Sequence, residues 1–78
     1  MRLANSRRAQ AKTSLLTPRE REVLVWVAQG KSAREIGEIL HITKRTVDEH
    51  AHTAVRKLGA LNRTHAVAIA LRDGIISV

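Results

Sequence analysis

The side chains best suited to recognising another molecule lie in one short stretch of this 78-residue chain. Lys44 and Arg45 can pair with phosphate groups. Asp48 and Glu49 can each accept a hydrogen bond from the amino group of cytosine, and His52 can donate to or accept from a base edge. Side chains that suit both phosphates and base edges indicate recognition of a nucleic acid.

The composition favours the same class of partner. Fourteen Lys and Arg against seven Asp and Glu give a formal net charge of +7, which favours a polyanion. Trp26 is the only aromatic residue, whereas RNA modules and single-strand binders stack bases on several aromatic side chains. Duplex DNA, held by phosphate contacts and groove insertion, fits better. We expect neither an enzyme nor a cofactor, because a chain this short forms a thin core with little room for a pocket.

Helix caps show where the scaffold of these side chains begins and ends. Residues 17–20 (Thr-Pro-Arg-Glu) and 32–35 (Ser-Ala-Arg-Glu) are capping boxes, and Thr43 and Asn62 suit two further N-caps. A glycine follows three of the predicted helices: Gly30, Gly59 and Gly74. The predicted helices are residues 18–29, 33–40, 44–58 and 63–73. The predicted fold class is therefore all-α, a compact four-helix domain with no strands.

Apolar residues at helical spacing predict the core. The predicted inward residues are Val23, Trp26, Val27, Ile36, Ile39, Leu40, Val47, Ala51, Ala54, Leu58, Val67, Ala70 and Leu71. Gly37 inside a helix predicts that another helix crosses closely there. His41 is expected to leave its helix with a positive φ. Ile75 and Ile76 are expected to form a short apolar tail.

The second and third predicted helices form a helix-turn-helix, because only residues 41–43 separate them. In such units the second helix lies in the major groove and its early residues face base edges. The predicted organisation is a flexible basic arm or linker remnant at 1–14 and a DNA-binding domain at 15–78.

The sequence resembles the LuxR-type helix-turn-helix domain over roughly residues 15–76. The residues that carry the resemblance are Leu16 to Leu24 (LTPREREVL), Gly30-Lys31-Ser32, Glu35-Ile36, Thr46-Val47, His50, Lys57-Leu58, Arg63 and Ala66-Val67. This resemblance implies a DNA-binding domain of a bacterial transcription regulator, in which the third helix reads DNA and the fourth commonly pairs protomers. The stretch from Arg56 to Thr64 resembles both the autoinducer-sensing and the phosphorylation-controlled branches, and we favour the first, which implies quorum sensing.

Candidate site residues follow from the resemblance and from the exposed faces of the predicted third and fourth helices. Those expected to contact bases are Asp48, Glu49 and His52. Those expected to contact phosphates are Lys44, Arg45, Thr46, His50, Arg56 and Lys57. Those expected at a dimer interface, through an exposed face of the fourth helix, are Ala66, Ile69, Ala70 and Asp73. Two departures from the family pattern, Gly37 for alanine and His41 for glycine, predict a less rigid turn.

Simpler roles compete with several of these assignments. Asp48 could pair with His52 one turn along the helix, and the charged residues 19–22 could form a solvated, self-neutralising face. The fourth helix could be a poorly amphipathic helix packed on the core. A metal site is not expected, because His50 and His52 lie on different helix faces and the His-Glu-x-x-His order is absent.

The expected partners are duplex DNA and a second copy of the chain, with RNA polymerase as a further candidate. Two other functions stay open: a promoter-reading domain of a sigma factor, and a protein-interaction module that binds a regulator or polymerase through the fourth helix and the Ile75–Ile76 tail. No apolar run approaches the roughly 20 residues of a membrane span, and we expect a cytoplasmic protein with no membrane partner.

Overall fold

The computed structural model describes residues 15–78 and contains four helices in that stretch. They are α2 (Pro18–Ala28), α3 (Ala33–Leu40), α4 (Lys44–Lys57) and α5 (Arg63–Arg72). All four begin at the predicted residue, and α2, α4 and α5 end one residue earlier than predicted. No strand occurs among the described residues, and the all-α prediction is confirmed. The predicted basic arm lies outside the described residues.

Polar side chains fix the start of each helix, as predicted. The Thr17 hydroxyl accepts a hydrogen bond from the Glu20 amide at 3.1 Å, and the Glu20 carboxylate accepts one from the Thr17 amide at 2.9 Å. Ser32 and Glu35 make the same reciprocal pair before α3. The Thr43 and Asn62 side chains each accept from the third amide of the helix that follows. These bonds satisfy amides that the helices themselves leave unpaired.

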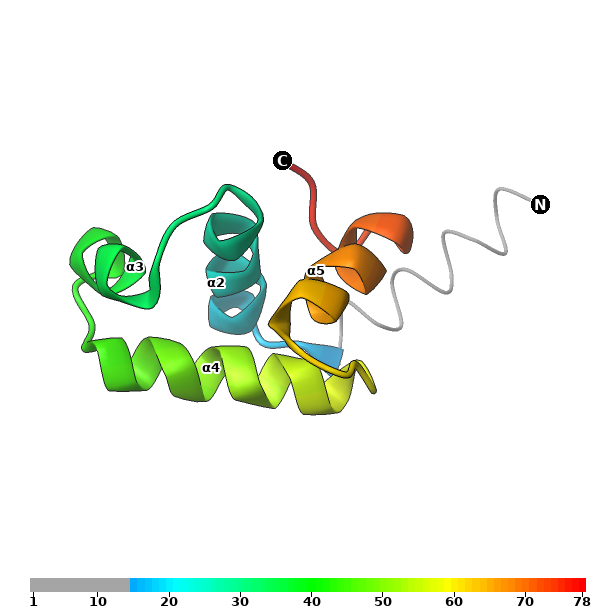
Figure 1. Ribbon diagram of the computed structural model, residues 1–78, viewed down its shortest axis with the longest axis horizontal. Coiled ribbons are helices and arrows are strands. Elements are labelled where there is room, and N and C mark those ends of the chain that lie inside the picture. The colour runs from blue at the N-terminus through cyan, green and yellow to red at the C-terminus, as the bar shows by residue number, and fades with distance from the viewer. Residues whose placement is uncertain (1–14) are drawn as a thin grey trace.

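Helix α4 is the base on which the other helices pack. Helices α2, α3 and α5 all lie on the same side of α4 (Figure 1). One core cluster joins α2, α4, α5 and the C-terminal segment, and its buried members are Leu16, Leu24, Ala54, Ala66, Ala70, Ile75 and Ile76. A second cluster joins α2, α3 and α4 through Val23, Ile36, Val47 and Ala51. This one-sided packing buries one face of α4 and leaves the opposite face uncovered.

Two residues predicted to be buried are exposed. Ile39 lies on the solvent side of α3, because the helix turns Ile36 and Gly37 inward instead. Leu71 lies on the solvent side of α5, whose buried face ends at Ala70. The prediction for Leu71 failed because α5 has apolar residues over much of its circumference, which does not specify which of them faces the core.

Two residues of the C-terminal segment, Ile75 and Ile76, are buried rather than part of an exposed apolar tail, whereas Val78 is exposed. The Ile75 amide donates to the Ala70 carbonyl at 2.8 Å, which turns the chain back onto α5. The side chains of Ile75 and Ile76 then complete the first core cluster. None of the helices within residues 15–78 is long and apolar enough to cross a membrane.

The turn of the helix-turn-helix depends on two unusual positions. A Cβ atom on Gly37 would lie 2.6 Å from the Ile42 carbonyl oxygen in the turn and 3.4 Å from the amide nitrogen of Lys44, the first residue of α4. The Ile42 amide donates to the Gly37 carbonyl at 3.0 Å and closes that turn. His41 adopts φ 59° and ψ 43°, which confirms the expected left-handed conformation.

We expect His41→Gly to stabilise the domain by about 0.5–1 kcal/mol. The left-handed region costs a residue with a Cβ roughly 1–2 kcal/mol, and the entropy that glycine loses on folding cancels part of the gain. Urea unfolding of both proteins measures the difference. His41→Ala is the control, because it keeps the Cβ and should not stabilise. A glycine variant no more stable than the alanine variant would show that the turn is not strained.

Candidate nucleic-acid interface

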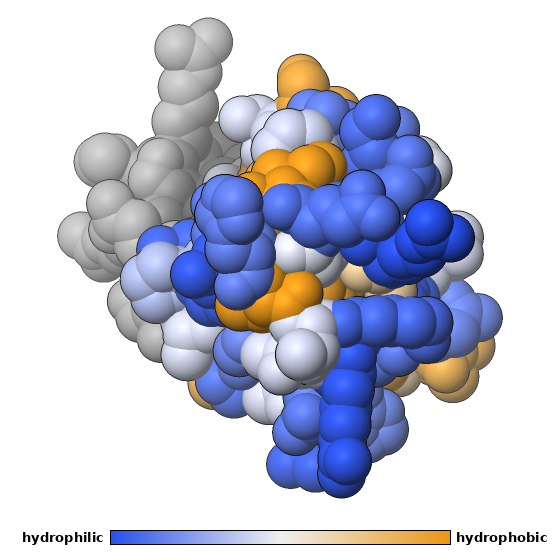
Figure 2. Space-filling view, turned by 90° about the vertical axis from the view of Figure 1, so that its left-hand side faces the viewer, coloured by the Kyte–Doolittle hydropathy of each residue, from blue (hydrophilic) through white to orange (hydrophobic). Residues whose placement is uncertain are grey.

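The uncovered face of α4 presents four polar residues in one line, which we call the outer stripe. It consists of Arg45, Glu49, His52 and Arg56, spaced four, three and four residues apart, and all four are exposed. Such spacing places side chains on a single face of a helix. In Figure 2, which looks onto the end of the molecule opposite α5, hydrophilic side chains occupy the lower edge, where α4 lies. The structure therefore brings together two predicted base-contacting residues and two predicted phosphate-contacting residues.

Within the stripe, Arg45 and Arg56 are the cations and Glu49 is the anion, and His52 lies between Glu49 and Arg56. Arg45 Nε lies 3.9 Å from Glu49 Oε1, one helical turn along. This pair is weak because both side chains are largely in solvent. Either residue can therefore leave the other at little cost when a stronger partner approaches.

Asp48 lies at the edge of the stripe and has two cationic partners. Its carboxylate accepts from Lys44 Nζ at 2.8 Å and from Arg63 Nη2 at 3.1 Å. Hydrogen bonds from Lys44 and then Arg63 lower the pKa of Asp48 below its ordinary value, so the group is ionised at neutral pH. The partner considered for Asp48 in the sequence, His52, is replaced by these two cations. Arg63, which starts α5, was not among the predicted site residues.

The remaining predicted phosphate contacts lie on the flanks of α4. Thr46 and His50 are half-buried, and the Thr46 hydroxyl accepts from the Thr43 hydroxyl at 2.9 Å. Both side chains lie on the opposite flank from Asp48, as their helical positions require.

Lys57 has a different environment from the one expected of a phosphate contact. Its Nζ lies 2.9 Å from Glu20 Oε1, and the two side chains are 29% and 6% exposed. Glu20 is therefore a buried carboxylate rather than part of a solvated face, which corrects the prediction for residues 19–22. Only Arg19 and Glu22 form the expected exposed pair, at 2.8 Å. The Lys57–Glu20 pair ties the end of α4 to the first turn of α2.

The Lys57–Glu20 pair makes the stability of the fold depend on pH. Burial acts to raise the pKa of Glu20, but hydrogen bonds from Lys57 and Thr17 and the charge of Lys57 outweigh it, and the net pKa is lowered. Glu20 therefore stabilises the fold above its unfolded pKa of 4.5, and this contribution is lost as the pH falls through the lower folded value.

We expect Glu20→Gln to flatten the acid limb of the stability curve. Glutamine keeps the acceptor of the capping box but does not titrate. Guanidinium unfolding from about pH 6 down to pH 3 should show a smaller loss of stability in the variant than in the parent chain. Parallel curves would show that Glu20 does not drive the acid loss.

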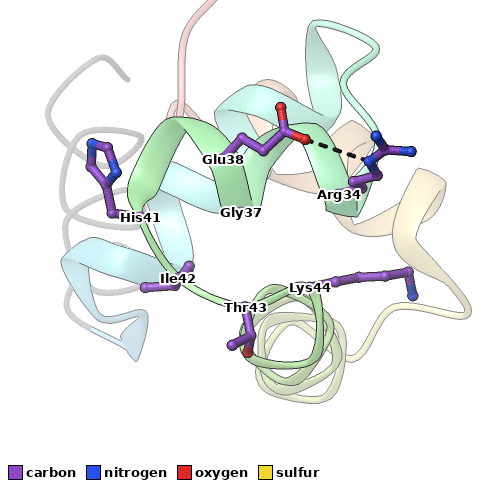
Figure 3. Close-up of a pocket in the computed structure, with 7 residues that line it drawn as sticks. All are labelled: Arg34, Gly37, Glu38, His41, Ile42, Thr43 and Lys44. Carbon is purple, nitrogen blue, oxygen red and sulfur yellow. Dashed lines mark ion pairs between the residues drawn. The ribbon is translucent and has the colours of Figure 1, made fainter.

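A shallow cleft opens beside the turn of the helix-turn-helix. Its volume is about 460 Å³, and it is lined by Arg34, Gly37, Glu38, His41, Ile42, Thr43 and Lys44. Arg34 and Lys44 extend to the same side of the cleft, and His41 lies on the other (Figure 3). Arg34 pairs with Glu38 at 3.4 Å. The cleft therefore adds cationic side chains beside the first turn of α4, at the edge of the outer stripe.

Helix α5 does not expose the residues expected at a dimer interface. Ala66, Ile69 and Ala70 face the core, so the expectation of an exposed face built from them is wrong. The Asp73 side chain is also largely covered, and it accepts from Arg72 Nε at 3.0 Å. They are buried because α5 packs on α2 and α4 along this face. The exposed residues of α5 are instead Thr64, Ala68, Leu71 and Arg72.

Comparison with known proteins identifies the family that builds this arrangement. Residues 14–70 match the family model described as bacterial regulatory proteins, luxR family. The chain belongs to the LuxR family. It is a helix-turn-helix DNA-binding domain of a transcription regulator, which excludes the sigma-factor alternative.

Individual LuxR-family members agree with this assignment. The chain is 73% identical over 62 residues to the transcriptional activator protein BjaR1 of Bradyrhizobium diazoefficiens, covering 80% of this chain and 26% of BjaR1. It is 56% identical over 73 residues to the quorum sensing-dependent transcriptional regulator RpaR of Rhodopseudomonas palustris, covering 94% of this chain and 30% of RpaR. The solved structure of the transcription factor GerE superimposes with a TM-score of 0.78 at 36% identity, covering 81% of this chain and 94% of GerE. The chain thus spans less than a third of the two curated relatives.

Proposed function

We propose that α4 enters the major groove of duplex DNA and reads a specific sequence there. The observation that carries this proposal is the outer stripe, which places Glu49 and His52 between Arg45 and Arg56 on a face that no other described element covers. Side chains in the middle of such a stripe can reach base edges while the flanking cations pair with the two phosphate backbones.

The roles within the interface follow from chemistry and position. Glu49 and His52 are the central base readers, and Asp48 lies at the edge of that set. The cations of the first turn and Arg56 hold phosphates, and Thr46 and His50 can add hydrogen bonds from the flank. The main role of Lys57 is to stabilise the fold through its ion pair with Glu20.

A dimer would place two copies of α4 about one turn of DNA apart and would require a dyad-symmetric site. The exposed side of α5, where Ala68 and Leu71 are apolar, is the surface available for such pairing. This surface replaces the buried residues suggested by the sequence. Sedimentation of the domain with and without a symmetric duplex measures the pairing.

The alternative function, a protein-interaction module, relied on two surfaces, the fourth helix and the Ile75–Ile76 tail, and the second is not exposed. Ile75 and Ile76, which were to bind a regulator or polymerase, are core residues. RNA polymerase remains a candidate partner only through exposed residues of the domain. We also propose that this regulator is cytoplasmic, is not an enzyme and responds to an autoinducer, in line with the quorum sensing-dependent relative RpaR.

Binding to matched duplex and single-stranded oligonucleotides tests the proposal, with fluorescence anisotropy at several salt concentrations as the readout. We expect duplex to bind more tightly, with affinity falling as salt rises because phosphate contacts release counterions. Equal affinity for single strands would contradict groove insertion, since the described residues offer Trp26 alone for stacking and it packs against the core.

A further inference from the structure

Three charged residues link the start of α4 to the start of α5, and we call them the bridging cluster. The Asp48 carboxylate lies between Lys44 of the same helix and Arg63 of α5, with one oxygen bonded to each. Two cations and one anion leave the cluster with a charge of +1. The carboxylate keeps the two cations close together despite their mutual repulsion.

The cations of the cluster are more exposed than the anion between them. The side chains of Lys44 and Arg63 are 67% and 41% exposed, compared with 36% for Asp48. A guanidinium has five N–H donors and an ammonium has three, so each cation can bond the carboxylate and a phosphate at once. An approaching DNA strand would therefore meet the cations of this cluster before its carboxylate.

Helix packing fixes the position of Arg63. It is the first residue of α5, directly after the N-cap Asn62, whose side chain accepts from the His65 amide at 2.8 Å. Helix α5 packs on α4 through Ala66 and Ala70. Arg63 is therefore held beside the recognition helix by elements that do not depend on Asp48 alone.

We infer that Arg63 is a phosphate contact supplied by α5, and that Asp48 is a positioning residue that aligns Arg63 and Lys44 on the DNA backbone. This inference rests on the proposed function, in which α4 enters the groove. It changes the role of Asp48 from base reader to positioning residue, since each of its two oxygens already accepts from a cation of the cluster. It also extends the phosphate contacts beyond α4 to a second helix.

The test compares Arg63→Gln and Asp48→Asn with the parent chain on two duplexes, one selected by the parent chain and one of scrambled sequence. We expect Arg63→Gln to lower affinity for both duplexes about tenfold at 0.1 M salt, and to reduce the salt slope by about one. Asp48→Asn should leave the preferred sequence unchanged. The effect of Asp48→Asn on affinity should be smaller in the Arg63→Gln background than in the parent chain, because one of the cations that Asp48 positions is then gone.

Two results would overturn the inference. A change of preferred base at one position of each half-site in Asp48→Asn would make Asp48 a base reader. An unchanged salt slope in Arg63→Gln would remove α5 from the DNA contact. If Arg63→Gln does not fold, Arg63→Met serves instead, because it also removes the charge while keeping much of the apolar length of the side chain, and the same losses of affinity and salt slope are expected. Failure of the parent chain to prefer duplex would instead refute the proposed function.

Discussion

Replacing Lys57 by methionine is expected to lower the free energy of unfolding by about 2–3 kcal/mol, because the buried Glu20 carboxylate loses its counter-ion. Methionine keeps most of the apolar length of the lysine side chain, so the change isolates the charge. A domain of this size is stable by roughly 4–12 kcal/mol, which makes the expected loss a large part of the total. Guanidinium unfolding and the thermal midpoint measure it.

Arg56→Met is the matched control for this prediction. It removes the same charge from the preceding residue, which is exposed and forms no buried pair, and should change stability by less than about 0.5 kcal/mol. Glu20→Gln combined with Lys57→Met should recover much of the loss, because no unpaired charge is then buried. Equal effects of the two methionine variants would contradict a structural role for Lys57. Any DNA-binding defect of a Lys57 variant must be measured where that variant is fully folded.

The second large effect concerns DNA affinity. Arg45→Ala combined with Arg56→Ala removes both cations of the outer stripe, and we expect affinity for every duplex to fall about 10²-fold at 0.1 M salt, since each phosphate contact contributes roughly tenfold there. The salt slope should fall by about two. Both residues are exposed, and the free energy of unfolding should change little.

Arg19→Ala combined with Lys31→Ala is the control for the stripe. Arg19 pairs with Glu22 on α2, and Lys31 is exposed between α2 and α3, so neither is on α4, and their loss removes the same total charge. If both double variants weakened DNA binding equally, net charge rather than the outer stripe would account for the affinity.

Local chemistry explains why the elements could be predicted. The capping boxes at Thr17 and Ser32 and the N-caps at Thr43 and Asn62 act within four residues, so their geometry is encoded where the sequence shows it. The left-handed backbone conformation of His41 was predictable because it also depends on local sequence, at the end of one predicted helix and just before the next. The helix ends were less exact, since the last turn of a helix frays and its final residue depends on the criterion used.

Contacts between distant segments explain what could not be predicted. The pairing of Lys57 with Glu20 joins residues 37 apart, and that of Arg63 with Asp48 joins residues 15 apart. Neither follows from periodicity, because each depends on how α4 packs against another helix. The burial of Ala66, Ile69 and Ala70 depends likewise on which side of a largely apolar helix meets the core.

Selection from randomised duplex DNA, carried out with the parent chain and with His52→Ala, tests the central claim most directly. The account predicts that the parent chain enriches a dyad-symmetric motif. It also predicts that His52→Ala loses preference at one position of each half-site, by about 1–3 kcal/mol, while the flanking positions are kept. An identical motif from both proteins would contradict the claim that the outer stripe of α4 reads the bases.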